Sequence, residues 1–236
     1  FLGDAPDQLA AKVGQGICDW RPDISLGQIR LPGCKADLGL PDYTLEEAKN
    51  AGAKTLIVGV ANRGGTFSST WKETLLKALS LKFDIASGLH NLLSEEKDFI
   101  ELARSNKCKL FDVRIPSEIF PIANGKKRSG IRCLTIGTDC SAGKMYSTLA
   151  LEREMLSRGK KATFRATGQT GILISGSGIP LDAVVADFMA GAVEALTPDS
   201  DADHWDLIEG QGSLFHVSYS GVTMALIHGG QPDHLI

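Results

Sequence analysis

The sequence has no surplus of basic residues, since 25 lysines and arginines stand against 28 aspartates and glutamates, for a net charge of −3. Proteins that hold nucleic acid by its phosphates usually carry a basic excess, so we expect no nucleic-acid partner. No apolar run approaches the length of a membrane span, and no signal-peptide pattern opens the sequence. We therefore expect no membrane partner either.

Cysteine is scarce, and its five copies are scattered without a Cys-x-x-Cys pair. This spacing favours neither a disulfide framework nor a zinc knuckle. His204, His228 and His234 have no partner spacing that suggests a metal site, so we assign no metal ligand. A reducing compartment fits this cysteine usage best, and we expect a cytoplasmic protein.

What the chain does have is a regular alternation of strand-like and helix-like stretches over residues 1–115. In chain order we expect a strand at 55–60, a helix at 69–81, a strand at 83–86, a helix at 94–105 and a strand at 109–113. This β-α-β-α-β rhythm predicts an α/β domain with a parallel sheet.

Two more helices are expected before the first of these strands. One covers residues 5–13, with Pro6 near its start. The other begins at Thr44, because Thr44 and Glu47 have the spacing of a capping box, and it runs to about residue 51.

A glycine- and proline-bearing segment at 116–129 includes the run Lys126-Lys127-Arg128, and we expect it to be a solvated linker. A second α/β domain is expected over residues 130–236. Its strands are placed at 131–136, 161–166 and 205–208, and its helices at 145–158, 181–196 and, weakly, 216–227, with a last strand from 235. These strands are few for a phosphate-loop domain, so we expect that domain to be incomplete at its C-terminal end.

The segment between the strand at 131–136 and the helix at 145–158 has the layout of a phosphate-binding loop. Small residues fill the turn, and Gly143-Lys144 closes it. Backbone N–H groups of such a loop converge on an anion, and the lysine ammonium reaches an outer phosphate. The candidate anion-binding residues are Gly137, Thr138, Cys140, Ser141, Ala142, Gly143, Lys144 and Met145. The alternative is a glycine-rich turn with a surface lysine.

Glu209 follows the apolar strand that ends at Ile208, and glycines follow it in turn. A carboxylate at such a strand end in phosphate-loop proteins lies near the anion and can hold Mg²⁺, although a solvated strand end is the plain alternative. For a general base our order is Glu209, then His216, then Asp139. His216 has a satisfied, partly buried histidine as its alternative. A nucleophilic Cys140 is possible in principle, but a small residue filling the turn explains it better.

Arg165 ends the strand that follows the loop helix, and its planar guanidinium could hold a substrate carboxylate. A structural ion pair is the alternative. Thr167 and Gln169 follow Arg165 as candidate substrate-binding residues. In the first domain, Asn62 and Arg63 lie in the glycine-bearing turn after the strand at 55–60, where ligands bind in open α/β sheets.

Two motifs resemble those of known enzymes. Gly137-Thr138-Asp139-Cys140-Ser141-Ala142-Gly143-Lys144 resembles the loop of dethiobiotin synthetase, and Glu209-Gly210-Gln211-Gly212 resembles its Glu-Gly-Ala-Gly strand end. A closer resemblance covers nearly the whole chain and points to the D-glutamate N-acetyltransferase family. It rests on the stretches at 1–6, 59–65, 137–146, 164–171 and 203–216.

The resemblance implies a Rossmann-like N-terminal domain joined to a P-loop domain that resembles those of NTPases. It implies transfer of acetyl from acetyl-CoA to the amine of D-glutamate. Met145 replaces the hydroxyl residue that usually binds Mg²⁺, so Mg²⁺ is possible but not expected to be required. The rivals are an ATP- and Mg²⁺-dependent carboxylate-activating enzyme and a non-catalytic nucleotide- or CoA-binding regulator. We expect small-molecule substrates and a homodimer or larger homo-oligomer.

Overall fold

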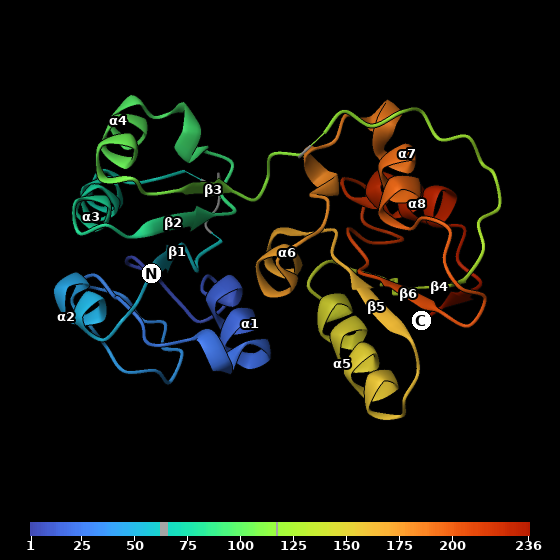
Figure 1. Cartoon of the computed structure of the whole chain (residues 1–236), viewed down its shortest axis with the longest axis horizontal. Coiled ribbons are helices and arrows are strands. Elements are labelled where there is room, and N and C mark those ends of the chain that lie inside the picture. Colours follow the sequence, from blue (N-terminus) through green and yellow to red (C-terminus); the bar gives the residue numbers. More distant parts are fainter. Residues whose placement is uncertain (62–65, 117) are drawn as a thin grey trace. The chain divides into compact units, whose positions relative to one another are not determined.

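The structure is a computed structural model that describes residues 1–61, 66–116 and 118–236. It divides into two compact units, Phe1–Arg114 and Ile115–Ile236 (Figure 1). Each unit has its own parallel sheet.

The sheet of the first unit has the strand order β1-β2-β3, and both neighbouring pairs are parallel. Its strands are β1 (Thr55–Ile57), β2 (Asp84–Ser87) and β3 (Leu110–Asp112), joined by α3 (Ser69–Ser80) and α4 (Lys97–Asn106). Short 3₁₀ turns lie at Pro22–Ile24 and Leu93–Glu95. The predicted β-α-β-α-β order is therefore confirmed.

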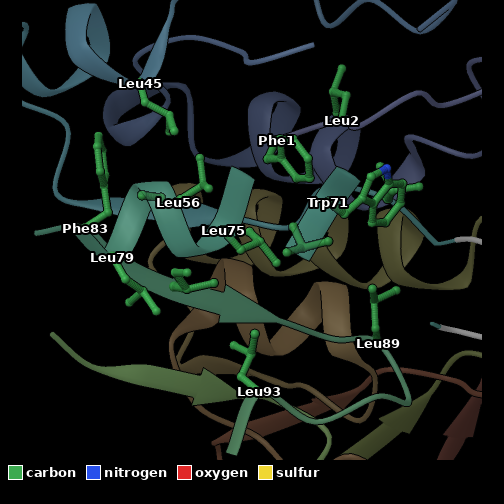
Figure 2. Packing of buried hydrophobic residues seen from close by; sticks show 14 of the residues in the cluster. Phe1, Leu2, Leu45, Leu56, Trp71, Leu75, Leu79, Phe83, Leu89 and Leu93 are labelled. Carbon is green, nitrogen blue, oxygen red and sulfur yellow. The ribbon is translucent and has the colours of Figure 1, made fainter. Parts of the chain in front are cut away.

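The core of the first unit is built on one face of α3. Trp71, Leu75 and Leu79 recur every fourth residue, so they share one face of the helix, and all three are buried. Figure 2 shows them in one cluster with Leu56 of β1 and with Phe1, whose ring meets Trp71 edge to face at 5.7 Å. Complete burial of one such leucine contributes about 1.5–3 kcal/mol.

The helix α2 (Leu45–Asn50) begins as its capping box predicts. The Thr44 side chain accepts the N–H of Glu47, and the Glu47 carboxylate accepts the N–H of Thr44. Two backbone donors that would lack a partner at a helix start are thereby satisfied.

The helix expected at 5–13 is wrong, because the first helix, α1, spans Lys12–Trp20. The preceding residues form turns in which Asp7 Oδ1 accepts the N–H of Ala10. Gly14 lies inside α1 and donates its N–H to the Gly59 carbonyl at 2.8 Å. A Cβ at Gly14 would lie 3.1 Å from Leu38 and 3.3 Å from the Gly59 carbonyl, so this long-range packing favours a glycine despite its poor helix propensity.

The second unit has the strand order β5-β6-β4-β7, again all parallel. Its strands are β4 (Ile131–Leu134), β5 (Ala162–Arg165), β6 (Trp205–Ile208) and β7 (His234–Leu235), and its helices are α5 (Lys144–Ser157), α6 (Gln169–Ser175), α7 (Ala186–Leu196) and α8 (Ser220–Gly230), with a 3₁₀ turn at Leu181–Ala183. Figure 1 shows α5 on one side of this sheet and α7 with α8 on the other.

Alternating strand residues separate the two faces of this sheet. Cys133 and Leu207 are buried against Leu151 and Met155 of α5. The adjacent residues along each strand, such as Ile208, face the other side of the sheet and are buried in the cluster formed by α7 and α8. Both faces are covered, as is usual for a parallel sheet.

Two helices of the second unit differ from expectation. The helix α6 was not predicted, because it is short and contains Gly171, a residue that the structure requires there for contact with Glu209. The helix expected at 216–227 begins only at Ser220, because Ser213 holds the N–H of His216 in the preceding turn.

The segment expected as a linker, 116–129, makes specific contacts with the second unit. Phe120 is buried in the α7–α8 cluster. Glu194 accepts the N–H groups of Asn124 and Gly125, and Arg128 Nε donates to the Thr197 carbonyl at 2.7 Å. Arg128 is therefore not part of a solvated charge run.

All five cysteines are free. Of the helices that the structure describes, none combines the length and apolar character that crossing a bilayer would require.

Candidate active site

The predicted anion-binding loop lies between β4 and α5, in the order that the sequence predicts. Lys144 is the first residue of α5, and Gly143 is its N-cap. Ser141 and Gly143 have left-handed backbones, with φ of 56° and 95°. Left-handed residues in such a turn direct successive N–H groups toward one point, and the start of a helix adds partial positive charge there.

The Lys144 side chain folds back over this loop. Its Nζ donates to the carbonyl of Asp139 at 3.0 Å and lies 3.3 Å from where a Cβ on Gly137 would stand. Burial lowers the pKa of Lys144 from its ordinary value, although the charges of Asp139 and Glu209 act in the opposite direction. The ammonium therefore lies against the loop whose N–H groups would meet an anion.

Glu209 reaches the same end of the sheet from the neighbouring strand. In the register of β4 and β6, Leu134 faces Ile208, so Glu209 comes directly after the strand, beside the start of the loop. Its side chain is only 4% exposed. Its Oε2 accepts two main-chain N–H groups, from Thr167 at 2.8 Å and Gly168 at 3.1 Å.

Burial raises the pKa of Glu209 to about 7, although the N–H groups of Thr167 and Gly168 and the charge of Lys144 lower it. Asp182, in the 3₁₀ turn, adds to the rise by charge repulsion. A carboxyl group with such a pKa can both take and give a proton near neutral pH.

Glycines let the backbone come close to these two charged side chains. A Cβ on Gly171 would overlap Glu209 Oε2, and a Cβ on Gly210 would overlap the carbonyl of Thr135. Any larger residue at Gly171 would therefore displace the carboxyl group.

Two buried threonines connect the loop helix with the strand end that carries Glu209. The hydroxyls of Thr135 and Thr148 share a hydrogen bond of 2.8 Å. Thr148 Oγ1 also donates to the Lys144 carbonyl, and Thr135 Oγ1 accepts the N–H of Gly210. Sequence reasoning missed this pair, as it missed Asp182 and Gly171, because no motif distinguishes them from ordinary small or polar residues.

His216 lies in a turn that contacts the loop, since the N–H of Leu214 donates to the Gly137 carbonyl at 2.9 Å. The imidazole itself is exposed and lies 4.5 Å from the Tyr219 ring, centroid to centroid. Its Nδ1 accepts the N–H of Ser218 at 3.2 Å, so the neutral ring carries its proton on Nε2. Taking a further proton at Nδ1 would break that bond, which favours Glu209 as the base.

The Arg165 guanidinium forms an ion pair with a buried aspartate and not with the Glu209 carboxylate. Its Nε donates to Asp206 Oδ1 at 2.7 Å, and Asp206 is fully buried. The same oxygen lies 3.6 Å from His204 Nε2. The alternation of β6 puts Asp206 on the face covered by α7 and α8, so this geometry matches the structural ion pair that the sequence left open.

The remaining predicted residues are spread over different environments. Thr167 is fully buried and donates its hydroxyl to the Glu209 carbonyl at 2.7 Å. Gln169 is partly buried at the start of α6, whereas Thr138 and Asp139 are exposed in the loop. Asn62 and Arg63 lie outside the described residues.

Asp139 uses its carboxylate inside the loop, where Oδ1 accepts the N–H of Cys140 at 2.7 Å. Within the described part of the chain, no three histidine, cysteine, aspartate or glutamate side chains gather as metal ligands would.

Two family models match this chain, and both are described as domains of unknown function. Residues 29–116 match the Rossmann-like domain DUF1611_N, and residues 121–236 match the P-loop domain DUF1611_C. Together with the two parallel sheets, these matches confirm the predicted fold class.

Similar proteins include two curated relatives named D-glutamate N-acetyltransferase. One, from Tritonibacter scottomollicae, is 69% identical over 236 residues, and another, from Pseudoalteromonas sp, is 45% identical over 236 residues. Each alignment covers 100% of this chain and 71% of the relative. A crystal structure of a DUF1611 family protein from Anabaena variabilis ATCC 29413 is similar with a TM-score of 0.86 and 30% identity, over 100% of this chain and 71% of that one.

Proposed function

This chain belongs to the DUF1611 family, and from that premise we propose that it transfers an acetyl group from acetyl-CoA to the amine of an acidic amino acid. D-Glutamate is the acceptor that we favour, because two close relatives are named for that reaction.

One observation carries this proposal: the candidate anion-binding loop and a buried acid with a pKa of about 7 share one end of one sheet. CoA brings phosphates that suit the loop N–H groups and Lys144. Acetyl transfer starts from an uncharged amine, which sheds one proton as its C–N bond forms, and we assign Glu209 to take that proton.

The reaction balances as a direct transfer. The amine nitrogen attacks the thioester carbonyl, its C–N bond forms, and the C–S bond breaks. Glu209 takes the proton at Oε1, since Oε2 already accepts two N–H groups, and the proton can then pass to the departing thiolate. Main-chain N–H groups of the loop are the candidate donors to the carbonyl oxygen as it becomes negative.

Arg165 remains our candidate for the substrate carboxylate. The Arg165 Nε donates a hydrogen bond to Asp206. Within the described part of the chain its two Nη groups have no hydrogen-bond partner, so their N–H donors remain available for a substrate. Arg165→Lys keeps the charge and loses the fork, so the KM for the amino acid should rise while that for acetyl-CoA changes less. If Arg165→Lys leaves both KM values at their wild-type levels, Arg165 has a structural role only.

An ATP-dependent carboxylate-activating reaction is the second candidate. The position of Glu209 favours it, because an acid at this strand end binds Mg²⁺ in many P-loop enzymes. Met145 in place of a hydroxyl residue removes one usual ligand of that ion and favours CoA instead.

The test is to mix purified full-length protein with acetyl-CoA and D-glutamate and to follow free thiol. Thiol release that depends on D-glutamate, and that persists in Cys140→Ser, supports direct transfer. L-Glutamate and D-aspartate, assayed in parallel, define chirality and chain length. Release of phosphate from ATP plus Mg²⁺, with no release of thiol from acetyl-CoA in the presence of any acidic amino acid, would support the second candidate instead.

A further inference from the structure

We propose that Thr167 is a positioning residue that holds the Glu209 carboxyl group in a fixed orientation and leaves only Oε1 open for proton transfer. The catalytic part of this inference rests on the proposed function. The geometric part stands without it.

Thr167 is the donor in both hydrogen bonds that join it to Glu209. The Thr167 N–H donates to Glu209 Oε2 at 2.8 Å, and its hydroxyl donates to the Glu209 main-chain carbonyl at 2.7 Å. One residue thus holds both the side chain and the backbone of the acid. Thr167 itself is 0% exposed, so it cannot contact substrate in this conformation.

Neighbouring residues also restrict the position of the Glu209 carboxyl group. Gly168 gives the second N–H to Oε2, and Gly171 of α6 packs directly against that oxygen. The charged groups that act on Glu209 are Lys144 on α5, which favours its ionised form, and Asp182 in the 3₁₀ turn, which disfavours it. With Oε2 saturated, the basic lone pairs that remain are on Oε1.

Removal of the Thr167 hydroxyl should release the backbone of Glu209 and lengthen the bonds from the two N–H groups to Oε2. Those bonds stabilise the ionised form, so the pKa of Glu209 should rise above about 7 when they weaken. Loss of orientation should lower kcat with little change in the KM for acetyl-CoA, because the CoA phosphates are held elsewhere.

The experiment compares Thr167→Val with Thr167→Ser in the full-length protein. The titration of Glu209 is read by carboxyl ¹³C NMR, with the Glu209→Gln spectrum as assignment control, and kcat and KM are measured in parallel. We expect Thr167→Val to raise the pKa by about half a unit to one unit and to lower kcat about ten- to a hundredfold. Thr167→Ser, which keeps the hydroxyl, should restore both.

The chain offers a matched control in Thr197. It is also 0% exposed, and its hydroxyl also donates to a main-chain carbonyl, that of Val193, at 2.7 Å. Its oxygen also accepts from Arg128 Nη2, so Thr197→Val should cost at least as much stability, and it should leave the titration of Glu209 and kcat unchanged. If Thr197→Val shifts them equally, or if Thr167→Val leaves them at wild-type values, the positioning role is refuted.

The two proposals fail in different ways. If Glu209→Gln stays fully active while Thr167→Val still moves the titration, Glu209 is not the base but Thr167 positions it as stated. If Glu209→Gln is inactive and Thr167→Val matches wild type in both readouts, the base stands and the positioning role falls.

Discussion

The strand β6 leads to two buried acids, Asp206 within it and Glu209 directly after it, and their surroundings differ. Asp206 is 0% exposed and faces the guanidinium of Arg165. Glu209 is 4% exposed, and the groups that hydrogen-bond to its side chain are uncharged main-chain N–H donors. One acid has a cation in hydrogen-bond contact, and the other does not.

The difference separates a structural carboxylate from a chemically available one. A hydrogen-bonded ion pair joins Asp206 to Arg165, and removal of Arg165 would leave a buried carboxylate without its cation. Neutral donors hold Glu209 in place without cancelling the cost of its charge, and burial therefore raises its pKa to about 7. The acid without the cation is the one suited to proton transfer.

The largest expected effect is on catalysis at Glu209. Glu209→Gln keeps the shape of the side chain and removes its basicity, so kcat/KM with acetyl-CoA and D-glutamate should fall about 10²- to 10⁴-fold. Steady-state thiol release measures this, with circular dichroism as a control for folding. A fall of less than about tenfold would remove Glu209 from the role of base.

The next effect concerns Asp206 and its cation. Arg165→Ala leaves a buried carboxylate without its partner and should lower the free energy of unfolding by about 3–5 kcal/mol. The exposed pair of Arg158 and Glu154 provides the control, because Arg158→Ala should cost less than about 1 kcal/mol. Urea unfolding of both variants measures the loss of unfolding free energy in each. Equal losses would contradict the distinction between the two acids.

The pH dependence of stability should report the raised pKa of Glu209 independently of catalysis. The pKa of Glu209 is raised in the folded state, to about 7 from 4.5, so the folded protein binds more protons than the unfolded chain between these values. Relative to Glu209→Gln, the wild type should therefore lose about 3 kcal/mol as pH rises from 4.5 to 7. Urea midpoints at pH 4.5, 6 and 8 measure this, and parallel curves for the two proteins would contradict it.

A smaller effect is expected at the loop. Lys144→Ala removes a charge-assisted hydrogen bond to a phosphate and should weaken CoA binding by about 1.5–3 kcal/mol. Calorimetry with CoA, ATP, and ATP plus Mg²⁺ measures the loss and also ranks the ligands. Lys160→Ala, a lysine with an exposed side chain beyond the C-terminal end of α5, is the control. Unchanged CoA affinity in Lys144→Ala would show that the loop does not hold the phosphates.

Features set by local sequence were predictable, and of the distant contacts only the approach of Glu209 to the loop was. The capping box at Thr44 and the strand-loop-helix order around Lys144 depend on near neighbours, and both were correctly predicted. The approach of Glu209 to the loop needed only the assumption that β6 lies beside β4, which is confirmed.

Thr167 shows the limit of that reasoning. Sequence places it near the site, and its type suggests a hydrogen bond to substrate, but its donors are directed to Glu209, 42 positions away. Arg165 meets Asp206 for a similar reason, through a diagonal contact between two strands that the chain itself does not reveal. Such pairings follow from strand register and burial, which single-sequence patterns do not encode.

The pH dependence of kcat/KM, measured for wild type beside Glu209→Gln, tests the central claim most directly. We predict that the wild type shows a rising limb with its midpoint at about 7, from ionisation of Glu209, and that this limb is absent from Glu209→Gln. A more alkaline limb from the amine of the acceptor should be common to both. Two profiles of the same shape, without a limb near pH 7 that belongs to the wild type alone, would contradict the assignment of Glu209 as the base.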